Sequence, residues 1–460
     1  MGREKLFIGM LLLIGSQLLW GAEPDPVMVP TPRARVLATS ATSRPFLAAL
    51  RSQQPVDLLA RGYAESEFTV RGFASDSQPY VTRVLVRRPQ VGGKFSGRLI
   101  VELLDSSSQY ETAPLWGFSW DYFLRRGDAW VGVTVSPAQL AALRKYNATR
   151  YDTLSLAAVP AEVCGRSQEG FAADVLSQVA ALLRSSSKEN PLLDLNPQRL
   201  ILAGYSGSGD HVTAFAAAQH RSLRLGNDTP IFDGYLDVSG MATYLTNPCV
   251  NSAIPRGVPF VAVLSESNTV RDMAGAGDAQ SEGFRVYEIA GVEGAGLVAA
   301  GAPAAADLAN AGFVAGVRCR EPVMDLMMSH ALNAVWQQLD DLLVRAQPLL
   351  GLPRIESAID GGTSGGWRLP QVDLPLAGHL PGRLVSTQSE GNANARPVCD
   401  ATTGSMPRFD AATLKQLYRS RAEYLRRFNT ALEQAVTNRL LLKEDADALK
   451  AAVLRTTPAF

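Results

Sequence analysis

Histidine and cysteine are scarce in this chain of 460 residues, which has four of each. The four cysteines, Cys164, Cys249, Cys319 and Cys399, form no CxxC pair and no cluster with histidine, the arrangements on which zinc sites are built. Neither a metal nor a cofactor is predicted.

An excess of charge of one sign is also missing, because 44 basic residues balance 44 acidic ones. This balance argues against nucleic acid or an anionic membrane surface as the main partner. The 46% of hydrophobic residues suffices for a sizeable core. We expect a small neutral molecule as the partner, and the sequence leaves the oligomeric state open.

A long apolar run occurs once, over 6–20, after two basic residues and before the small residues Gly21 and Ala22. This order is typical of a secretory signal. A membrane anchor is the alternative, but the run is shorter than the roughly 20 residues that span a bilayer. We therefore predict a signal peptide over 1–22, a secreted or periplasmic protein, and no stable membrane span after removal of the signal. In an oxidising compartment the four cysteines are candidates for two disulfides, whose pairing stays open.

Strand and helix patterns alternate through the middle of the chain. The expected strands are 67–72, 81–87, 97–104, 129–135, 199–203, 232–238, 259–264 and 284–289, and the expected helices are 171–184, 210–220 and 324–345. This alternation predicts an α/β fold, with a mainly parallel sheet that has helices on both faces. In such sheets ligands bind at the carboxyl ends of the strands.

Three segments are expected to follow the signal peptide: an N-terminal segment over 23–65, a core over 66–350 that begins with a β-rich part, and a C-terminal extension over 351–460. The extension is rich in Gly, Pro and Thr as far as residue 408, and two amphipathic patterns follow, over 414–428 and 440–449. We interpret these patterns as a helical pair packed on the core.

A strand–turn–helix pattern surrounds Ser206, in the run Leu-Ala-Gly-Tyr-Ser-Gly-Ser-Gly over 202–209. A serine on such a tight reversal is the nucleophile elbow of the α/β-hydrolase fold, where the turn exposes the hydroxyl and backbone N–H groups can bind an oxyanion. Gly204 fills the glycine position before the serine, and Ser208 stands where a second glycine is usual. The alternative is a Gly/Ser-rich turn at a helix N-terminus, which could bind an anion.

The elbow predicts partners for Ser206. The N–H of Gly207 is one expected oxyanion donor, and the second is expected at Leu104 or within 104–106, although the polar run 105–108 could equally be a turn that ends a strand. The acid of a triad follows the nucleophile in chain order, and Glu266 stands at the end of the strand 259–264. Its alternative role is that of a solvated strand-end residue.

The histidine is harder to find, because the loop that should present it, over 292–296, contains none. His211 and His220 precede the acid, whereas His330 keeps the order of nucleophile, acid and base. His330 is therefore the candidate base, with a structural histidine at a helix start as the alternative.

The chain resembles a family of secreted or periplasmic alpha/beta hydrolase domain-containing proteins. The resemblance extends from about residue 80 to the C-terminus and is carried by the elbow and by the runs 97–104, 127–133, 151–155, 265–266, 287–291, 365–370 and 424–428. The family's elbow is similar to G-E-S-Q-S, which implies that Ser206 is the nucleophile and that a serine at position 208 is ordinary.

Two family motifs are altered here. The motif S-E-T-D, whose aspartate is the usual acid, ends at Asn268, and the histidine of A-G-T-A-H falls on Gly294. The resemblance thus implies a carboxylesterase-like serine hydrolase that acts on a small neutral acyl ester. The two altered positions favour, as the alternative, a catalytically impaired member that binds a small molecule.

Overall fold

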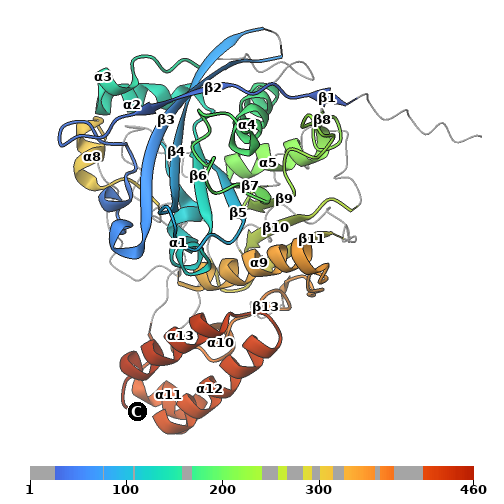
Figure 1. Cartoon of the computed structure of the whole chain (residues 1–460). Coiled ribbons are helices and arrows are strands. Elements are labelled where there is room, and N and C mark those ends of the chain that lie inside the picture. Colours follow the sequence, from blue (N-terminus) through green and yellow to red (C-terminus); the bar gives the residue numbers. More distant parts are fainter. Residues whose placement is uncertain are drawn as a thin grey trace, which may run out of the picture.

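The computed structural model describes residues 26–75, 77–106, 109–157, 168–240, 257–266, 283–292, 301–313, 326–357, 363–377 and 408–460. Nine strands form one sheet in the order β11-β10-β9-β7-β5-β6-β4-β3-β2 (Figure 1). These strands are β2 (Arg33–Leu37), β3 (Tyr63–Phe73), β4 (Pro79–Pro89), β5 (Arg98–Leu103), β6 (Ala129–Val133), β7 (Arg199–Tyr205), β9 (Gly234–Val238), β10 (Phe260–Ser265) and β11 (Phe284–Ile289). The six strands from β6 to β11 in this order are parallel, and β4, β3 and β2 continue the sheet in antiparallel pairs.

Helices follow most of the parallel strands, and further helices lie in the C-terminal extension. They are α1 (Pro114–Arg126), α2 (Leu140–Tyr146), α3 (Ala148–Tyr151), α4 (Gln168–Arg184), α5 (Gly207–Ala218), α8 (Ala305–Asn310), α9 (Leu326–Arg345), α10 (Pro370–Asp373), α11 (Ala411–Tyr418), α12 (Arg421–Thr437) and α13 (Lys443–Thr456). Two short pairs lie outside the main sheet: β1 (Val27–Met28) with β8 (Leu223–Arg224), and β12 (Glu356–Ser357) with β13 (Thr363–Ser364). The predicted α/β-hydrolase type of fold, a mainly parallel sheet flanked by helices, is confirmed.

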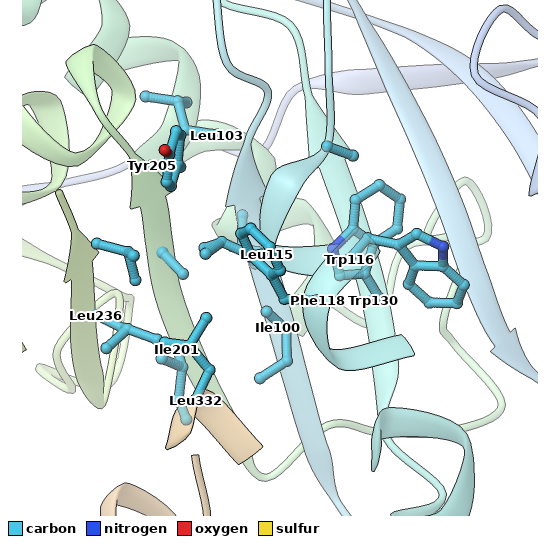
Figure 2. Close-up of a cluster of buried hydrophobic side chains, with 14 of the residues drawn as sticks. Ile100, Leu103, Leu115, Trp116, Phe118, Trp130, Ile201, Tyr205, Leu236 and Leu332 are labelled. Carbon is cyan, nitrogen blue, oxygen red and sulfur yellow. The ribbon is translucent and has the colours of Figure 1, made fainter. Parts of the chain in front are cut away.

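The central strands are buried on both faces, as expected for parallel strands that are continuous apolar runs. Successive side chains alternate between the faces. Figure 2 shows Ile201 and Leu236 near Leu332 of α9 on one face. On the other face Tyr235, the neighbour of Leu236, contacts Phe215 of α5. Helices α1 and α9 therefore cover one face and α5 the other, and α4 packs beside α5.

The antiparallel end of the sheet contains two buried arginines of β4. Arg83 forms ion pairs with Glu67 of β3 and Glu111, and Arg87 forms one with Glu65. A buried guanidinium is tolerated only when charges and hydrogen bonds compensate it. These pairs connect β4 to β3 and to Glu111, in the segment that precedes α1.

Between residues 411 and 456 the C-terminal extension forms three helices, α11, α12 and α13, where the amphipathic patterns predicted a pair. Residue Arg419 has a φ of 63°, a backbone conformation that cannot continue a helix, so α11 ends there. The side chain of Ser420 then caps α12 by accepting a hydrogen bond from the N–H of Glu423. Figure 1 shows these helices gathered beside α9 at one end of the molecule. In the part of the chain that the structure describes, no helix is long and apolar enough to span a membrane.

Candidate active site

Ser206 occupies the sharp turn between β7 and α5, with φ 53° and ψ −127°. An L-residue other than glycine rarely adopts such a backbone conformation, and strain of this kind is concentrated at functional sites. The Ser206 N–H donates to the carbonyl of Val238, at the end of the neighbouring strand β9, over 2.8 Å. This bond holds the strained residue at the carboxyl edge of the sheet.

Two glycines make the turn possible by allowing backbone and side chains to approach closely. A Cβ atom on Gly204 would overlap the backbone carbonyl of Ser208 and lie 2.8 Å from the Gly209 nitrogen. A Cβ atom on Gly209 would overlap the carboxylate of Asp237. Gly207, in contrast, has open space around its Cβ position. The second sterically required glycine is thus Gly209, one residue after the usual place.

Ser208 is buried, and its hydroxyl donates a hydrogen bond of 3.1 Å to the carbonyl of Leu104. Leu104 follows β5, so this bond joins the elbow to the loop that precedes α1. The N–H of Leu104 donates to the carbonyl of Val133 in β6, over 3.1 Å. That engagement in the sheet argues against the Leu104 N–H as an oxyanion donor, whereas Gly207 stands at the first position of α5, where backbone N–H groups lack partners within the helix.

The two ends of the segment between β5 and α1 are hydrogen-bonded to each other. Asp105 and Thr112 exchange two backbone hydrogen bonds, of 3.0 and 3.2 Å. The Gln139 side chain donates to the carbonyl of Ser106 over 3.1 Å, and Glu111 pairs with the buried Arg83. The described residues of this loop are therefore held from several sides.

Glu102, in β5, holds the start of α1. Its carboxylate accepts hydrogen bonds from the N–H groups of Leu115 and Trp116, each 2.9 Å long, and from the Trp130 indole over 2.8 Å. Burial raises the pKa of Glu102 to about 7 in spite of these donors. The signal that could have found this residue is a single acidic position among the apolar residues that follow Arg98 in β5.

Tyr205, directly before the nucleophile, is buried beneath the site. Burial raises the pKa of its phenol, the nearby charge of Asp105 raises it further, and a hydrogen bond with Ser239 opposes the rise. Ser239 follows β9 and, like Ser206, has a positive φ, 60°. Adjacent strand ends thus carry two serines in left-handed backbone conformations.

Glu266 lies at the end of β10, at the same edge of the sheet as Ser206. Its side chain is buried and accepts a hydrogen bond of 2.6 Å from the N–H of Gly291, which follows β11. This burial contradicts the alternative role of Glu266 as a solvated residue at a strand end. Its role as the acid stays a prediction.

The three histidines that the structure describes lie on two helices or beside them, and His379 falls outside the described residues. His220 follows α5, whose 12 residues separate it from the nucleophile by about 18 Å. Its ring contacts the Tyr235 hydroxyl at 2.9 Å, and burial, with help from nearby arginines, lowers its pKa to about 4. His211 lies within α5, and His330 lies near the start of α9, on the face of the sheet that α1 shares. The role of His330 as the base stays a prediction.

Asn268, Gly294 and the four cysteines fall outside the described residues. Among the residues that are described, no group of three or more His, Cys, Asp or Glu side chains could hold a metal ion.

The arrangement of the sheet, the elbow and the covering helices agrees with a comparison of the sequence with family models. The model of the alpha/beta hydrolase domain matches residues 29–451. The chain belongs to the alpha/beta hydrolase domain family. None of the curated proteins matches it significantly.

Solved structures similar to this alpha/beta hydrolase domain protein include several esterases and serine hydrolases. A glucuronoyl esterase from Solibacter usitatus has 11% identity and a TM-score of 0.31, and the match covers 53% of this chain and 70% of that one. A serine hydrolase from Xanthomonas campestris has 12% identity and a TM-score of 0.30, with 49% and 84% covered. A serine hydrolase homologue from Coxiella burnetii has 10% identity and a TM-score of 0.30, with 48% and 88% covered.

Proposed function

We propose that this protein is a serine hydrolase that cleaves small neutral acyl esters through Ser206. The observation that carries the proposal is the strained backbone of Ser206 between β7 and α5, with a φ of 53°. A strained backbone conformation persists only where the surrounding structure holds it. At Ser206 the hydrogen bond to Val238 holds it, and Gly204 and Gly209 leave the space that the turn needs.

In the proposed reaction the Ser206 hydroxyl attacks the ester carbonyl carbon while a base removes its proton. The tetrahedral oxyanion collapses, the alcohol leaves with that proton, and water then hydrolyses the acyl-enzyme by the same steps. The Gly207 N–H supplies one oxyanion donor. The second is proposed at Ser106, within the range 104–106, since Leu104 and Asp105 both donate their N–H groups to other carbonyls.

Orientation of the backbone supports Ser106 as this second donor. Asp105 directs both its N–H and its carbonyl at Thr112. In planar trans peptides the carbonyl and the N–H point in opposite directions, so the Leu104 carbonyl and the Ser106 N–H both point away from Thr112. On that side the hydroxyl of Ser208, two residues from the nucleophile, donates a hydrogen bond to the Leu104 carbonyl.

His330 is the proposed base, with Glu266 as the carboxylate that supports it. His330 follows Glu266 in the chain, and α9 begins after β11, the strand beside which Glu266 is held. A catalytically impaired protein that binds a small molecule is the second candidate, favoured by Asn268 and Gly294 at the two altered motif positions. A triad enzyme without its base can keep roughly a thousandfold acceleration over water from binding and the oxyanion hole.

A fluorophosphonate probe on the purified protein separates the two candidates. The proposal expects labelling of the parent that disappears in Ser206→Ala and persists in His211→Ala, with acyl-ester hydrolysis following the same pattern. His330→Ala should label at least about a hundredfold more slowly. Equal labelling rates in His330→Ala and the parent would rule out His330 as the base, and a parent that stays unlabelled from neutral to alkaline pH would favour the binding protein.

Export to the periplasm or the medium is a further part of the proposal. It rests on the apolar run over 6–20 and the small residues that follow it. Fractionation of cells that express the full chain should recover protein shortened by about 22 residues outside the cytoplasm. Full-length protein retained inside the cell would contradict export.

A further inference from the structure

Ser208 is a buried polar side chain beside the nucleophile for which the reaction scheme above has no use. It is 3% exposed and lies at the second position of α5. Its hydroxyl spans from the elbow to the Leu104 carbonyl, across 104 residues of sequence. A buried hydroxyl that makes a long-range contact of this kind can fix the relative position of two segments.

The contact acts on one peptide unit. The carbonyl of Leu104 accepts from Ser208, and the N–H of the same unit, that of Asp105, donates to Thr112 over 3.0 Å. Both polar groups of this unit are therefore held, one by the elbow and the other by the far end of the loop. A peptide plane held on both sides cannot rotate without breaking a buried hydrogen bond.

The orientation of this unit determines where the next one points. The following carbonyl, that of Asp105, accepts from the Thr112 N–H over 3.2 Å. If the Leu104–Asp105 unit turned, the Asp105–Thr112 pair would open and the Ser106 N–H would lose its direction away from Thr112, which it shares with the Leu104 carbonyl. Oxyanion stabilisation depends on donors within about 2.7–3.1 Å of the developing charge, so a small rotation is enough to weaken it.

We propose that Ser208 is a positioning residue: its hydroxyl holds the start of the loop, residues 104–106, against the elbow and so aims the second oxyanion donor. This deepens the proposed hydrolase function and rests on it. A glycine at position 208, the residue usual in the elbow motif, could not make this bond. This side chain of the elbow thereby connects the nucleophile turn to the loop.

The test compares Ser208→Ala and Ser208→Gly, which both remove the hydroxyl, with Ser177→Ala. Ser177 is equally buried, lies in α4, and donates to the carbonyl of Asp174 within its own helix. The concentration of active sites is titrated with the fluorophosphonate, so that a misfolded fraction does not count as slow catalysis. Ester hydrolysis and inhibition by a trifluoromethyl ketone, which forms a tetrahedral oxyanion on the serine, are then measured.

We expect both Ser208 variants to lose about tenfold in kcat and in affinity for the ketone while KM stays within about twofold, because the loss falls on the transition state. Amide hydrogen exchange in peptides that cover 104–112 should be faster in these variants and unchanged in Ser177→Ala. Parent values of kcat and ketone affinity in both Ser208 variants would overturn the proposal. If the parent itself neither labels nor hydrolyses esters, the proposed function fails, and the exchange comparison still decides whether Ser208 holds the loop.

Discussion

At the scale of single residues, the conformation of the elbow requires glycine at positions where the neighbouring backbone leaves no room for a side chain. Ser206 keeps a strained conformation because Gly204 lets the turn fold back onto the first residues of α5. The atoms that a Cβ on Gly204 would meet belong to the backbone of Ser208 and Gly209, which cannot swing aside as a side chain can. The steric demand of the elbow is therefore local and strict.

Gly204→Ala is expected to destabilise the protein by about 2–3 kcal/mol and to abolish labelling of Ser206, because overpacking forces the turn open. The free energy of unfolding in urea and the fluorophosphonate labelling rate measure the two effects. Gly207→Ala is the matched control for stability: its Cβ meets no atom within 4 Å, so the free energy of unfolding should change by less than about 0.5 kcal/mol. Equal destabilisation by the two substitutions would show that steric overlap is not what the elbow avoids.

At the scale of elements, a buried carboxylate connects a strand to a helix. Glu102 of β5 accepts the first free N–H groups of α1 and thereby replaces a conventional capping residue, which α1 lacks because Ala113 precedes it. This links the strand before the oxyanion loop to the helix after it. The link has a consequence for pH dependence, because burial raises the pKa of Glu102 from 4.5 to about 7.

Stability should therefore fall as the pH rises from about 4.5 through 7. Below this window the carboxyl is protonated in both states, whereas within it the unfolded chain releases the proton first and is favoured. The effect amounts to at most about 3 kcal/mol. In Glu102→Gln the difference in unfolding free energy between pH 5 and pH 8 should shift by an amount of this order, whereas Glu444→Gln, whose side chain is 67% exposed, should keep the parent profile. Parallel profiles for the parent and Glu102→Gln would contradict the assignment.

The helices and strands differ in how well they could be predicted from the sequence. The expected strand 284–289 and helix 324–345 agree closely with β11 and α9, because buried strands and one-sided helices leave clear apolar patterns. Helix α1 escaped prediction, since Leu115, Trp116 and Phe118 are all buried and give no contrast between faces. A single residue in a positive φ, Arg419, divided an amphipathic pattern that reads as continuous.

In the candidate site, too, local features could be predicted from the sequence and contacts between distant residues could not. Ser206 and Gly207 could be predicted because the elbow is a local motif of a few residues. Two other contacts could not be predicted, because their residues are far apart in the sequence. The bond between Ser208 and Leu104 joins positions 104 residues apart, and the bond between Glu102 and Trp130 joins positions 28 residues apart. The hydrogen bond from the Leu104 N–H to the Val133 carbonyl likewise depends on the pairing of β5 with β6, and the strand order of a sheet cannot be read from the sequence alone.

At the scale of the whole molecule, the C-terminal helices pack on the same helices that support the sheet. Asp445 of α13 accepts hydrogen bonds from Arg125 of α1 over 2.6 Å and from Asn333 of α9 over 2.9 Å. The Trp367 indole donates to the carbonyl of Leu440, and the buried side chains of α11 and α12 belong to the main hydrophobic cluster. A shared core predicts that the extension and the sheet unfold together.

Asp445→Ala is expected to lower the free energy of unfolding by about 2 kcal/mol, because it leaves the buried amide of Asn333 without its acceptor and removes one partner of Arg125. Asp447→Ala, two residues along the same helix, breaks an ion pair with Lys443 in which both side chains are more than half exposed, so it should cost less than about 0.5 kcal/mol. Urea unfolding followed by tryptophan fluorescence and by circular dichroism measures both variants. If the extension and the core form one cooperative unit, the two signals coincide in the parent and in both variants. Separate transitions in Asp445→Ala would mean that the Asp445 contacts are what joins them, and separate transitions in the parent would refute the shared core as a unit of folding.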